Sequence, residues 1–427
     1  MEPLVVLLGL GAPAAYALMR ARGIGQADFL ATARRTSMAL TLAGVICGNI
    51  GIGTFVALFL FTAESPVLGY TVALSYAAGL LLCAALAGRI HAASRATGTY
   101  GLVDYLAAAH GLGSSLPIWA PVAVAFALRS IVQLMALGLI LELSLGLAPG
   151  IALAIAGLAV GLYTAIGGYR VALETDLAQA LIILAGMALA ALGLFADTPP
   201  GVAGPAFFDL GPRGLPFLIA AALFLPFSAV LAVDNWQRIA TATSAGTARR
   251  AYLLGAAICT PVYLLLARLG QVAANGGASG MAEALGAFRA LMPPGLPVLA
   301  DLVVMMAVMS SIDTFVMPLM TGLSRTRWGM GRIRLAVAGV FAVLTLVALG
   351  IGDALTGVIA AFNTLVVFLP AVLGALVLGD RAPRAAMLSM GLGVAATLAL
   401  GALALDLAAL AGFLLAAGLY AALRRRA

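Results

Sequence analysis

Two short stretches of this chain combine the oxygen-bearing side chains that a small cation needs. The segment MMAVMSSIDTFVMPLM, residues 305–320, places hydroxyls and one carboxylate in apolar surroundings. The segment YTAIGGYRVALETDLAQ, residues 163–179, carries a Glu-Thr-Asp triplet between two long apolar runs and reads as a polar hinge. Oxygen ligands suit hard cations, but a buried acid can also bind a proton. Asp176 and Asp313 are therefore candidate ligands for sodium or for protons.

An arginine lies near the middle of another apolar run, in the segment FALRSIVQLMALG. A central arginine in a membrane costs at least ~2.5 kcal/mol, so Arg129 must face a polar interior. Its guanidinium group matches a substrate carboxylate through two parallel hydrogen bonds. The alternative is a structural role, in which Arg129 pairs with a buried acid or with backbone carbonyls. Gln133 lies four residues later on the same helix face, and we expect it to line the same cavity.

A glycine-rich segment, AGVICGNIGIGT at residues 43–54, predicts an interrupted helix. Glycine is unfavourable inside helices, and an unwound turn leaves carbonyl groups free to bind a cation. Close helix packing through small residues is the alternative. A weaker signal is Pro226 in LFLPFSAV, residues 223–230, because proline removes a helical hydrogen bond. We expect the first of these helices to be broken around Asn49.

The elements that hold these residues are membrane-spanning helices. The chain has 427 residues, of which 63% are hydrophobic and 9% are charged. Long apolar runs recur along the whole sequence, and we expect an all-α integral membrane protein with about 13 transmembrane helices. This composition excludes a soluble globular protein. Three scattered cysteines indicate neither a disulfide framework nor a metal site.

The basic residues predict the orientation. All 23 are arginines, and they gather in alternate loops. By the positive-inside rule these loops are cytoplasmic, which places the N-terminus outside and the C-terminus in the cytoplasm. We expect a multi-pass protein of the cell inner membrane. The net charge of +7 is then an orientation signal, and we expect no nucleic-acid partner.

Two blocks of five helices, residues 37–197 and 215–378, have similar lengths and opposite predicted orientations. This arrangement is typical of inverted-repeat transporters, whose sites lie where the first helix of each repeat is broken. We expect residues 1–36 to form a peripheral helix and loop. Residues 379–427 are expected to form two further peripheral helices.

Four motifs follow one another in an order that indicates a known family: GTYGLVDYL at 98–106, YTAIGGYRVALETDLAQ at 163–179, DNWQRIATA at 234–242 and AVMSSIDT at 307–314. They resemble signatures of the sodium/solute symporter family, which carries sugars, proline, pantothenate, sialic acid and monocarboxylates. The resemblance implies a LeuT-type fold of 5+5 inverted repeats with peripheral helices. It also implies sodium as the coupling ion.

The resemblance further implies the ligands of a sodium site. Matched by position, these are two carbonyls of the broken helix and, near residue 310, one carbonyl and two hydroxyls: Cys47, Ile50, Ala307, Ser310 and Ser311. Some family members are thought to hold a second sodium. The matching positions are Asp176, Ser310, Asp313 and Thr314, where an aspartate replaces one hydroxyl.

The substrate positions differ from those of sugar carriers in this family. Gly53 and Ala77 stand where sugar carriers have acids, and Arg129 stands where they have an asparagine. The sialic-acid branch is similar in placing a substrate-binding arginine there, which favours an organic anion over a neutral sugar. We expect the substrate cavity to be lined by Arg129, Asn49, Thr54, Gln133 and Phe224.

Together these features predict a sodium-coupled symporter that imports a small carboxylate, either sialic-acid-like or a monocarboxylate. Two alternatives stay open: a proton-coupled carrier of a neutral solute, and a transporter-like membrane sensor module. We expect no enzyme, because the sequence contains no nucleophile–base pair and no Walker motif. The expected partners are the solute, sodium and the lipid bilayer.

Overall fold

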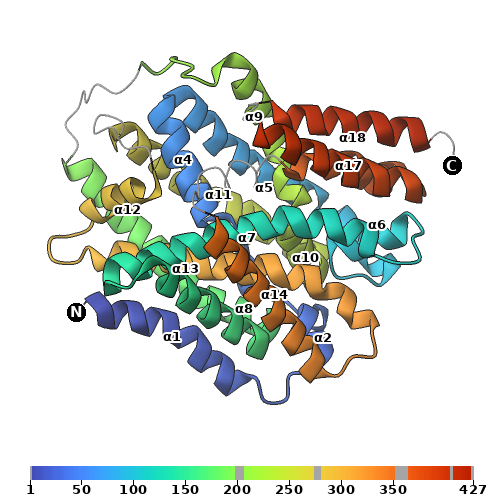
Figure 1. Cartoon of the computed structure of the whole chain (residues 1–427), viewed down its shortest axis with the longest axis horizontal. Coiled ribbons are helices and arrows are strands. Elements are labelled where there is room, and N and C mark those ends of the chain that lie inside the picture. The colour runs from blue at the N-terminus through green and yellow to red at the C-terminus, as the bar shows by residue number, and fades with distance from the viewer. Residues whose placement is uncertain (1, 198–205, 274–279, 352–363, 404–406, 425–427) are drawn as a thin grey trace.

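The computed structural model describes residues 2–197, 206–273, 280–351, 364–403 and 407–424. Within these ranges the chain is helical and forms no β-strand (Figure 1). Nine of the described helices are long and apolar enough to cross a membrane, and one bent pair makes a tenth span. The all-α membrane architecture predicted from the apolar runs is therefore confirmed.

The helices of the first half are α1 Glu2–Arg20, α2 Gln26–Ala31, α3 Met38–Asn49, α4 Ile52–Glu64, α5 Pro66–Thr97, α6 Leu102–Ala109, α7 Leu116–Leu145 and α8 Pro149–Asp197. Those of the second half are α9 Gly214–Leu231, α10 Val233–Thr241, α11 Ala245–Ala273, α12 Met281–Ala290, α13 Val298–Val316, α14 Met330–Gly350, α16 Leu369–Leu373, α17 Pro383–Ala402 and α18 Ala408–Arg424. The predicted span 354–378 lies partly outside the described residues, and its described part includes a short apolar helix, Val366–Leu378.

The bent pair is α3 and α4, which meet at an angle of 44°. Ser37 caps the start of α3 by accepting a hydrogen bond from the backbone N–H of Leu40. The helix ends at Asn49, where Ile50 leaves helical geometry and Gly51 is extended. The break expected around Asn49 is thus present in the structure.

The second broken helix is interrupted at a different point from the one that proline suggested. α9 continues through Pro226 to Leu231, and the chain turns extended at Ala232 before α10 begins. A proline removes one helical hydrogen bond, which bends a helix without always ending it. Every residue of α10 is buried, including its acidic and basic side chains.

The apolar runs at 149–167 and 176–197, which predict two spans, both lie in α8. This helix is kinked at Gly168. Gly168 has a φ of +63°, and a Cβ there would lie 2.6 Å from the carbonyl oxygen of Phe29. Glycine is required by both the backbone conformation and this close approach. The polar segment 163–179 is therefore helical on either side of one glycine, and the expected hinge is confined to that residue.

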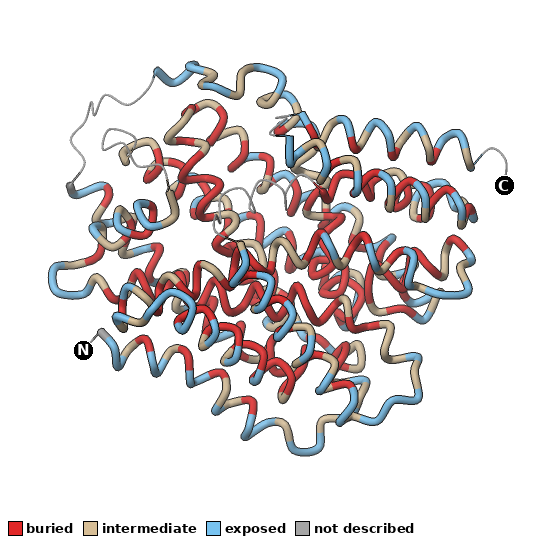
Figure 2. Tube along the Cα trace, viewed as in Figure 1, coloured by how far each residue is buried: buried red, intermediate tan, exposed pale blue. Residues whose placement is uncertain are grey.

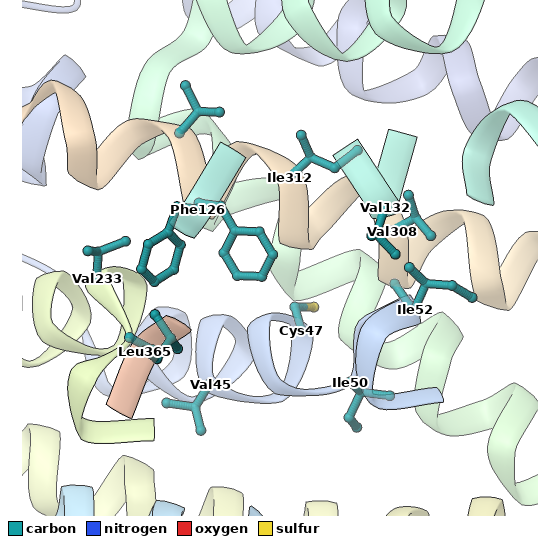
Figure 3. Close-up of a cluster of buried hydrophobic side chains, with 14 of the residues drawn as sticks. Val45, Cys47, Ile50, Ile52, Phe126, Val132, Val233, Val308, Ile312 and Leu365 are labelled. Carbon is teal, nitrogen blue, oxygen red and sulfur yellow. The ribbon is translucent and has the colours of Figure 1, made fainter. Parts of the chain in front are cut away.

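The core of the molecule surrounds α13 (Figure 2). The apolar window of α13 is 94% buried, whereas that of α1 is 22% buried. α13 packs against α3, α7 and α8, which brings the broken helix and the hydroxyl-rich segment together (Figure 1). Apolar side chains of these elements, among them Ile50, Val132 and Ile312, fill the space around the break (Figure 3).

Candidate functional site

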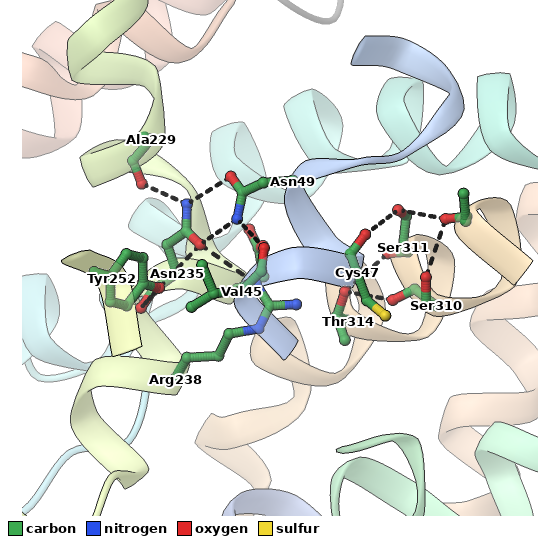
Figure 4. A network of polar contacts seen from close by, with 12 residues as sticks. Val45, Cys47, Asn49, Ala229, Asn235, Arg238, Tyr252, Ser310, Ser311 and Thr314 are labelled. Atoms are coloured by element: carbon green, nitrogen blue, oxygen red, sulfur yellow. Dashed lines mark hydrogen bonds and ion pairs between the residues drawn. The ribbon is translucent and has the colours of Figure 1, made fainter. Parts of the chain in front are cut away.

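The last turn of α3 exposes carbonyl groups toward α13. Helix ends leave their final carbonyls without intrahelical partners, and at α3 the last of these belong to residues 47–50. The hydroxyl of Ser311 lies 3.4 Å from the carbonyl oxygen of Cys47 and donates to that of Ala307 at 2.8 Å (Figure 4). Ser310 donates to the same Ala307 carbonyl at 3.1 Å. Two hydroxyls and two carbonyls therefore converge between the two helices.

These groups are four of the five predicted ligands of the sodium site. The fifth, Ile50, is buried at the break three residues after Cys47 (Figure 3). Neutral hydroxyl and carbonyl oxygens are hard donors that suit an alkali cation. The donor set at the α3–α13 contact accordingly fits sodium.

A second group of candidate ion-binding side chains lies beside the first. Asp176 and Asp313 are fully buried. Within the described ranges, neither carboxylate oxygen of Asp176 has a hydrogen-bond partner, nor has Oδ1 of Asp313. Tyr163 contacts the other oxygen of Asp313 at 2.8 Å, and the Cys47 thiol donates to the backbone carbonyl of Asp176 at 3.3 Å. Buried carboxylates without partners are costly, so these acids fit a bound cation or a bound proton.

Two more polar side chains belong with this group. Thr314 donates within α13, to the carbonyls of Ser310 and Ser311 at 2.9 and 3.1 Å. Gln179 is buried one turn after Asp176, and neither atom of its amide has a partner among the described residues. Residue patterns did not single out Gln179, although it closes the Thr-Asp…Gln motif.

A cavity opens at the break between α3 and α4. Four of the five predicted substrate residues line it: Asn49, Thr54, Arg129 and Gln133. The guanidinium carbon of Arg129 lies 5.6 Å from the ring centre of Phe126 and 5.7 Å from that of Phe315. These distances allow cation–π attraction, which orients the charge beside the cavity.

The fifth predicted residue, Phe224, lines a neighbouring apolar cavity and not this one. Its ring packs against that of Phe413, with 4.9 Å between the ring centres. Phe224 lies near Pro226, but the helix is interrupted only at Ala232. The break is about two helical turns after Phe224 in the chain. Phe224 therefore lines the neighbouring cavity and not the cavity lined by the other predicted substrate residues.

Side chains that were not predicted to bind substrate complete the cavity wall, notably Tyr76, Tyr263 and, from the motif at 234–242, Asp234 and Asn235. The amide of Asn49 donates to the side-chain oxygen of Asn235 at 3.2 Å (Figure 4). Tyr263 donates to the backbone carbonyl of Asn49 at 3.1 Å. This network joins the two broken helices directly. The sequence signal for these residues was the asparagine beside each break, Asn49 in the first and Asn235 in the second.

A buried ion pair lies beneath the same wall. Arg238 is fully buried and pairs with Asp234 one turn before it in α10. The Arg238 side chain packs against α3 at Gly44, where an added Cβ would lie 2.9 Å from Nε of Arg238. The glycines of α3 therefore make room for this arginine as well as allowing the break.

The sequence of this chain matches a known family of transporters. Residues 29–203 match the model of the sodium:solute symporter family. Over these residues the chain is similar to that family. No curated relative matches the sequence. The matched family and the solved structures described below are transporters and not enzymes.

Solved structures similar to this chain support the LeuT-type fold expected from the sequence. A Na+-coupled sialic acid symporter in a substrate-bound outward-open state matches with a TM-score of 0.77 and 15% identity, over 100% of this chain and 97% of that one. Mhp1, a nucleobase-cation-symport-1 family transporter, matches in a closed conformation with a TM-score of 0.60 and 16% identity, over 94% and 95%. Its inward-facing conformation matches with 0.54 and 17%, over 93% and 92%.

Proposed function

We propose that this protein is a symporter that imports a small organic carboxylate across the inner membrane together with sodium. The observation that carries the proposal is the position of Arg129 in the cavity at the helix break. Of the residues that line this cavity, Arg129 and Asp234 carry a charge. Asp234 pairs with Arg238, and Arg129 is the basic side chain among the described residues of the wall, which favours an anion in the cavity.

The polar groups around Arg129 supply further donors and acceptors for the head of such a substrate. Gln133 accepts a hydrogen bond from the backbone N–H of Ile52 at 3.2 Å through Oε1, which leaves its amide N–H groups for other partners. A guanidinium and an amide on one helix face suit a planar carboxylate. The head of the substrate would therefore bind between Arg129 and Gln133.

Sodium would bind between α3 and α13, at Cys47, Ile50, Ala307, Ser310 and Ser311. A second sodium would bind at Asp176, Asp313 and Thr314, where buried carboxylate oxygens lack partners among the described residues. The first ion would hold the broken helix against α13 while the substrate is bound. Its release into the cytoplasm would loosen that contact and free the substrate.

Gly51 lies between the proposed sodium site and the substrate cavity, and its position would couple the two. A Cβ at Gly51 would lie 2.5 Å from the hydroxyl oxygen of Ser311 and 2.8 Å from the amide nitrogen of Gln133. One backbone position therefore separates a predicted sodium ligand from a side chain of the substrate cavity. If sodium binding shifts the backbone at the break, the contacts of Gly51 with Ser311 and with Gln133 would both change.

We further propose that residues 37–197 and 215–378 are two inverted repeats. The first helix of each, α3–α4 and α9–α10, is broken in the middle, and the two breaks are joined through Asn49 and Asn235. The arginine-rich loops would face the cytoplasm, with the N-terminus outside.

The test is uptake of labelled carboxylates into liposomes that carry the purified protein. We expect an inward sodium gradient to drive uptake, and Arg129→Ala to abolish it while sodium still raises the thermal stability of the variant. Arg332→Ala, which removes an exposed arginine near the start of α14, is the control and should transport normally. Normal uptake by Arg129→Ala would reject the carboxylate clamp. Uptake that ignores sodium and follows external acid would reject the ion assignment.

A further inference from the structure

A second cavity adjoins the substrate cavity, and its walls have a different chemistry. It lies between α4, α5 and α9, with residues of the α18 segment closing one side. Tyr76 and Ser228 line both cavities, so these two side chains form the shared wall between them. Every other described residue that lines the second cavity is apolar.

Part of the wall of this apolar cavity is aromatic, formed by Phe61, Tyr76, Phe217 and Phe224. The rings of Phe61 and Phe217 pack edge to face with 5.7 Å between their centres. The guanidinium carbon of Arg213 lies 5.3 Å from the first ring and 5.2 Å from the second. Arg213 is in turn held by two contacts to the carboxylate of Glu64, at 2.8 and 3.3 Å. The aromatic wall is thus fixed in place by an ion pair and is suited to hold an apolar group.

We propose that the transported solute is a monocarboxylate with an apolar tail, whose carboxylate binds at Arg129 while its tail passes Tyr76 and Ser228 into the apolar cavity. The inference rests on the proposed function and narrows its substrate class. Two properties of the site support it: a cationic side chain in the wall of one cavity, and an apolar cavity separated from the first by the side chains of Tyr76 and Ser228.

A polyhydroxylated acid fits this pair of cavities less well. Its hydroxyl groups would face phenyl and alkyl side chains, and buried hydroxyls without partners are strongly unfavourable. An alkyl or aryl tail would instead gain from leaving water. The structure therefore favours short fatty or arylalkyl acids over sugar acids.

Binding measurements on the full chain in nanodiscs, with sodium present, test the proposal. The probes are acetate, butanoate, hexanoate and phenylacetate, with gluconate as the polyhydroxylated acid and hexanamide as the neutral tail. We expect each added methylene to tighten binding about fourfold. Gluconate should bind no better than acetate, and hexanamide should bind far more weakly than hexanoate.

A cavity-filling variant locates the tail. Ala221 is buried in the wall of the apolar cavity, and Ala222 is exposed on the same helix. Ala221→Phe should weaken hexanoate binding at least tenfold and leave acetate binding unchanged, whereas Ala222→Phe should change neither. Acetate binding also reports that the variant is folded. If Ala221→Phe binds no acetate, Phe217→Ala replaces it, and the enlarged cavity should then shift the preference toward octanoate.

The outcomes separate this inference from the proposed function. If no carboxylate binds, whatever its length, both are wrong. If carboxylates bind equally at all lengths, or if Ala221→Phe leaves hexanoate binding intact, the tail proposal is wrong and the carboxylate symporter stands. Equal binding of hexanamide and hexanoate, unaffected by Arg129→Ala, would make the apolar cavity a lipid or amphiphile site and would also overturn the proposal.

Discussion

Ser311 is the side chain that touches both helices of the candidate sodium site. Its hydroxyl lies within 3.4 Å of the Cys47 carbonyl and 2.8 Å of the Ala307 carbonyl, and its lone pairs remain able to bind a cation. The Ser311 hydroxyl can therefore bridge α3 and α13 in the absence of an ion and also act as a ligand when sodium binds.

We expect Ser311→Ala to raise the sodium concentration for half-maximal uptake by about tenfold, because one interaction worth ~1–1.5 kcal/mol is lost. Sodium-dependent uptake under a fixed substrate concentration measures the change. Ser389→Ala is the matched control, since that buried hydroxyl also donates to its own helix, at Ala386 in α17. An unchanged sodium dependence in Ser311→Ala would remove Ser311 from the site.

Asp176 carries the second residue-scale prediction. Both its carboxylate oxygens are buried and lack partners among the described residues, which calls for a compensating positive charge. We expect Asp176→Asn to make the sodium dependence of uptake less steep, because the neutral amide no longer attracts a second cation. The slope of uptake against sodium concentration is the measurement. A normal slope with an altered pH dependence would assign proton binding to Asp176.

At the scale of elements, the broken helix α3–α4 connects the ion site to the substrate cavity. The break is confined to two residues, since Ile50 leaves helical geometry and Gly51 is extended just before α4 begins. Its position relative to α7 and α13 depends on the absence of a side chain, because Gln133 and Ser311 approach it from two sides.

We expect Gly51→Ala to abolish sodium-driven uptake, since its methyl group would push Ser311 and Gln133 apart. Gly88→Ala in α5 is the control, because a Cβ there meets nothing within 4 Å. That control should transport normally and gain up to about 1 kcal/mol of stability from better helix propensity. Uptake and thermal unfolding of both variants are the measurements. Normal transport by Gly51→Ala would show that the break is not the coupling element.

At the scale of the whole molecule, the network that joins the two broken helices predicts coupled binding. Asn49, Asn235 and Tyr263 link α3 to α9–α10 and α11, beside the cavity that holds Arg129. If sodium and substrate favour the same arrangement of these helices, each must raise the affinity of the other by the same factor.

We expect saturating sodium to tighten carboxylate binding by about 5–150-fold, and saturating carboxylate to tighten sodium binding by the same factor. Titration calorimetry in both orders measures the two values. Potassium in place of sodium is the control and should leave carboxylate binding at its low level. Carboxylate binding that sodium does not change would contradict a symport mechanism built on these contacts.

Local sequence patterns are enough to predict the class of protein, the break near Asn49 and the identity of the buried polar residues. Apolar runs of helical length predict spans, clustered glycines predict a break, and an acid or arginine within a span must find a polar partner. Each of these rules needs only a short window of residues. For this reason the amino-acid types and their places in the apolar runs already single out Arg129, Asp176 and Ser311.

Which of these residues meet depends on tertiary packing. Asn49 and Asn235 are 186 residues apart in sequence, and no local pattern predicts their contact. The position of Phe224 in the chain favours the substrate cavity, yet packing places its ring in the apolar neighbour. Side-chain contacts between distant helices depend on how those helices rotate and pack, which the spacing along one helix does not specify.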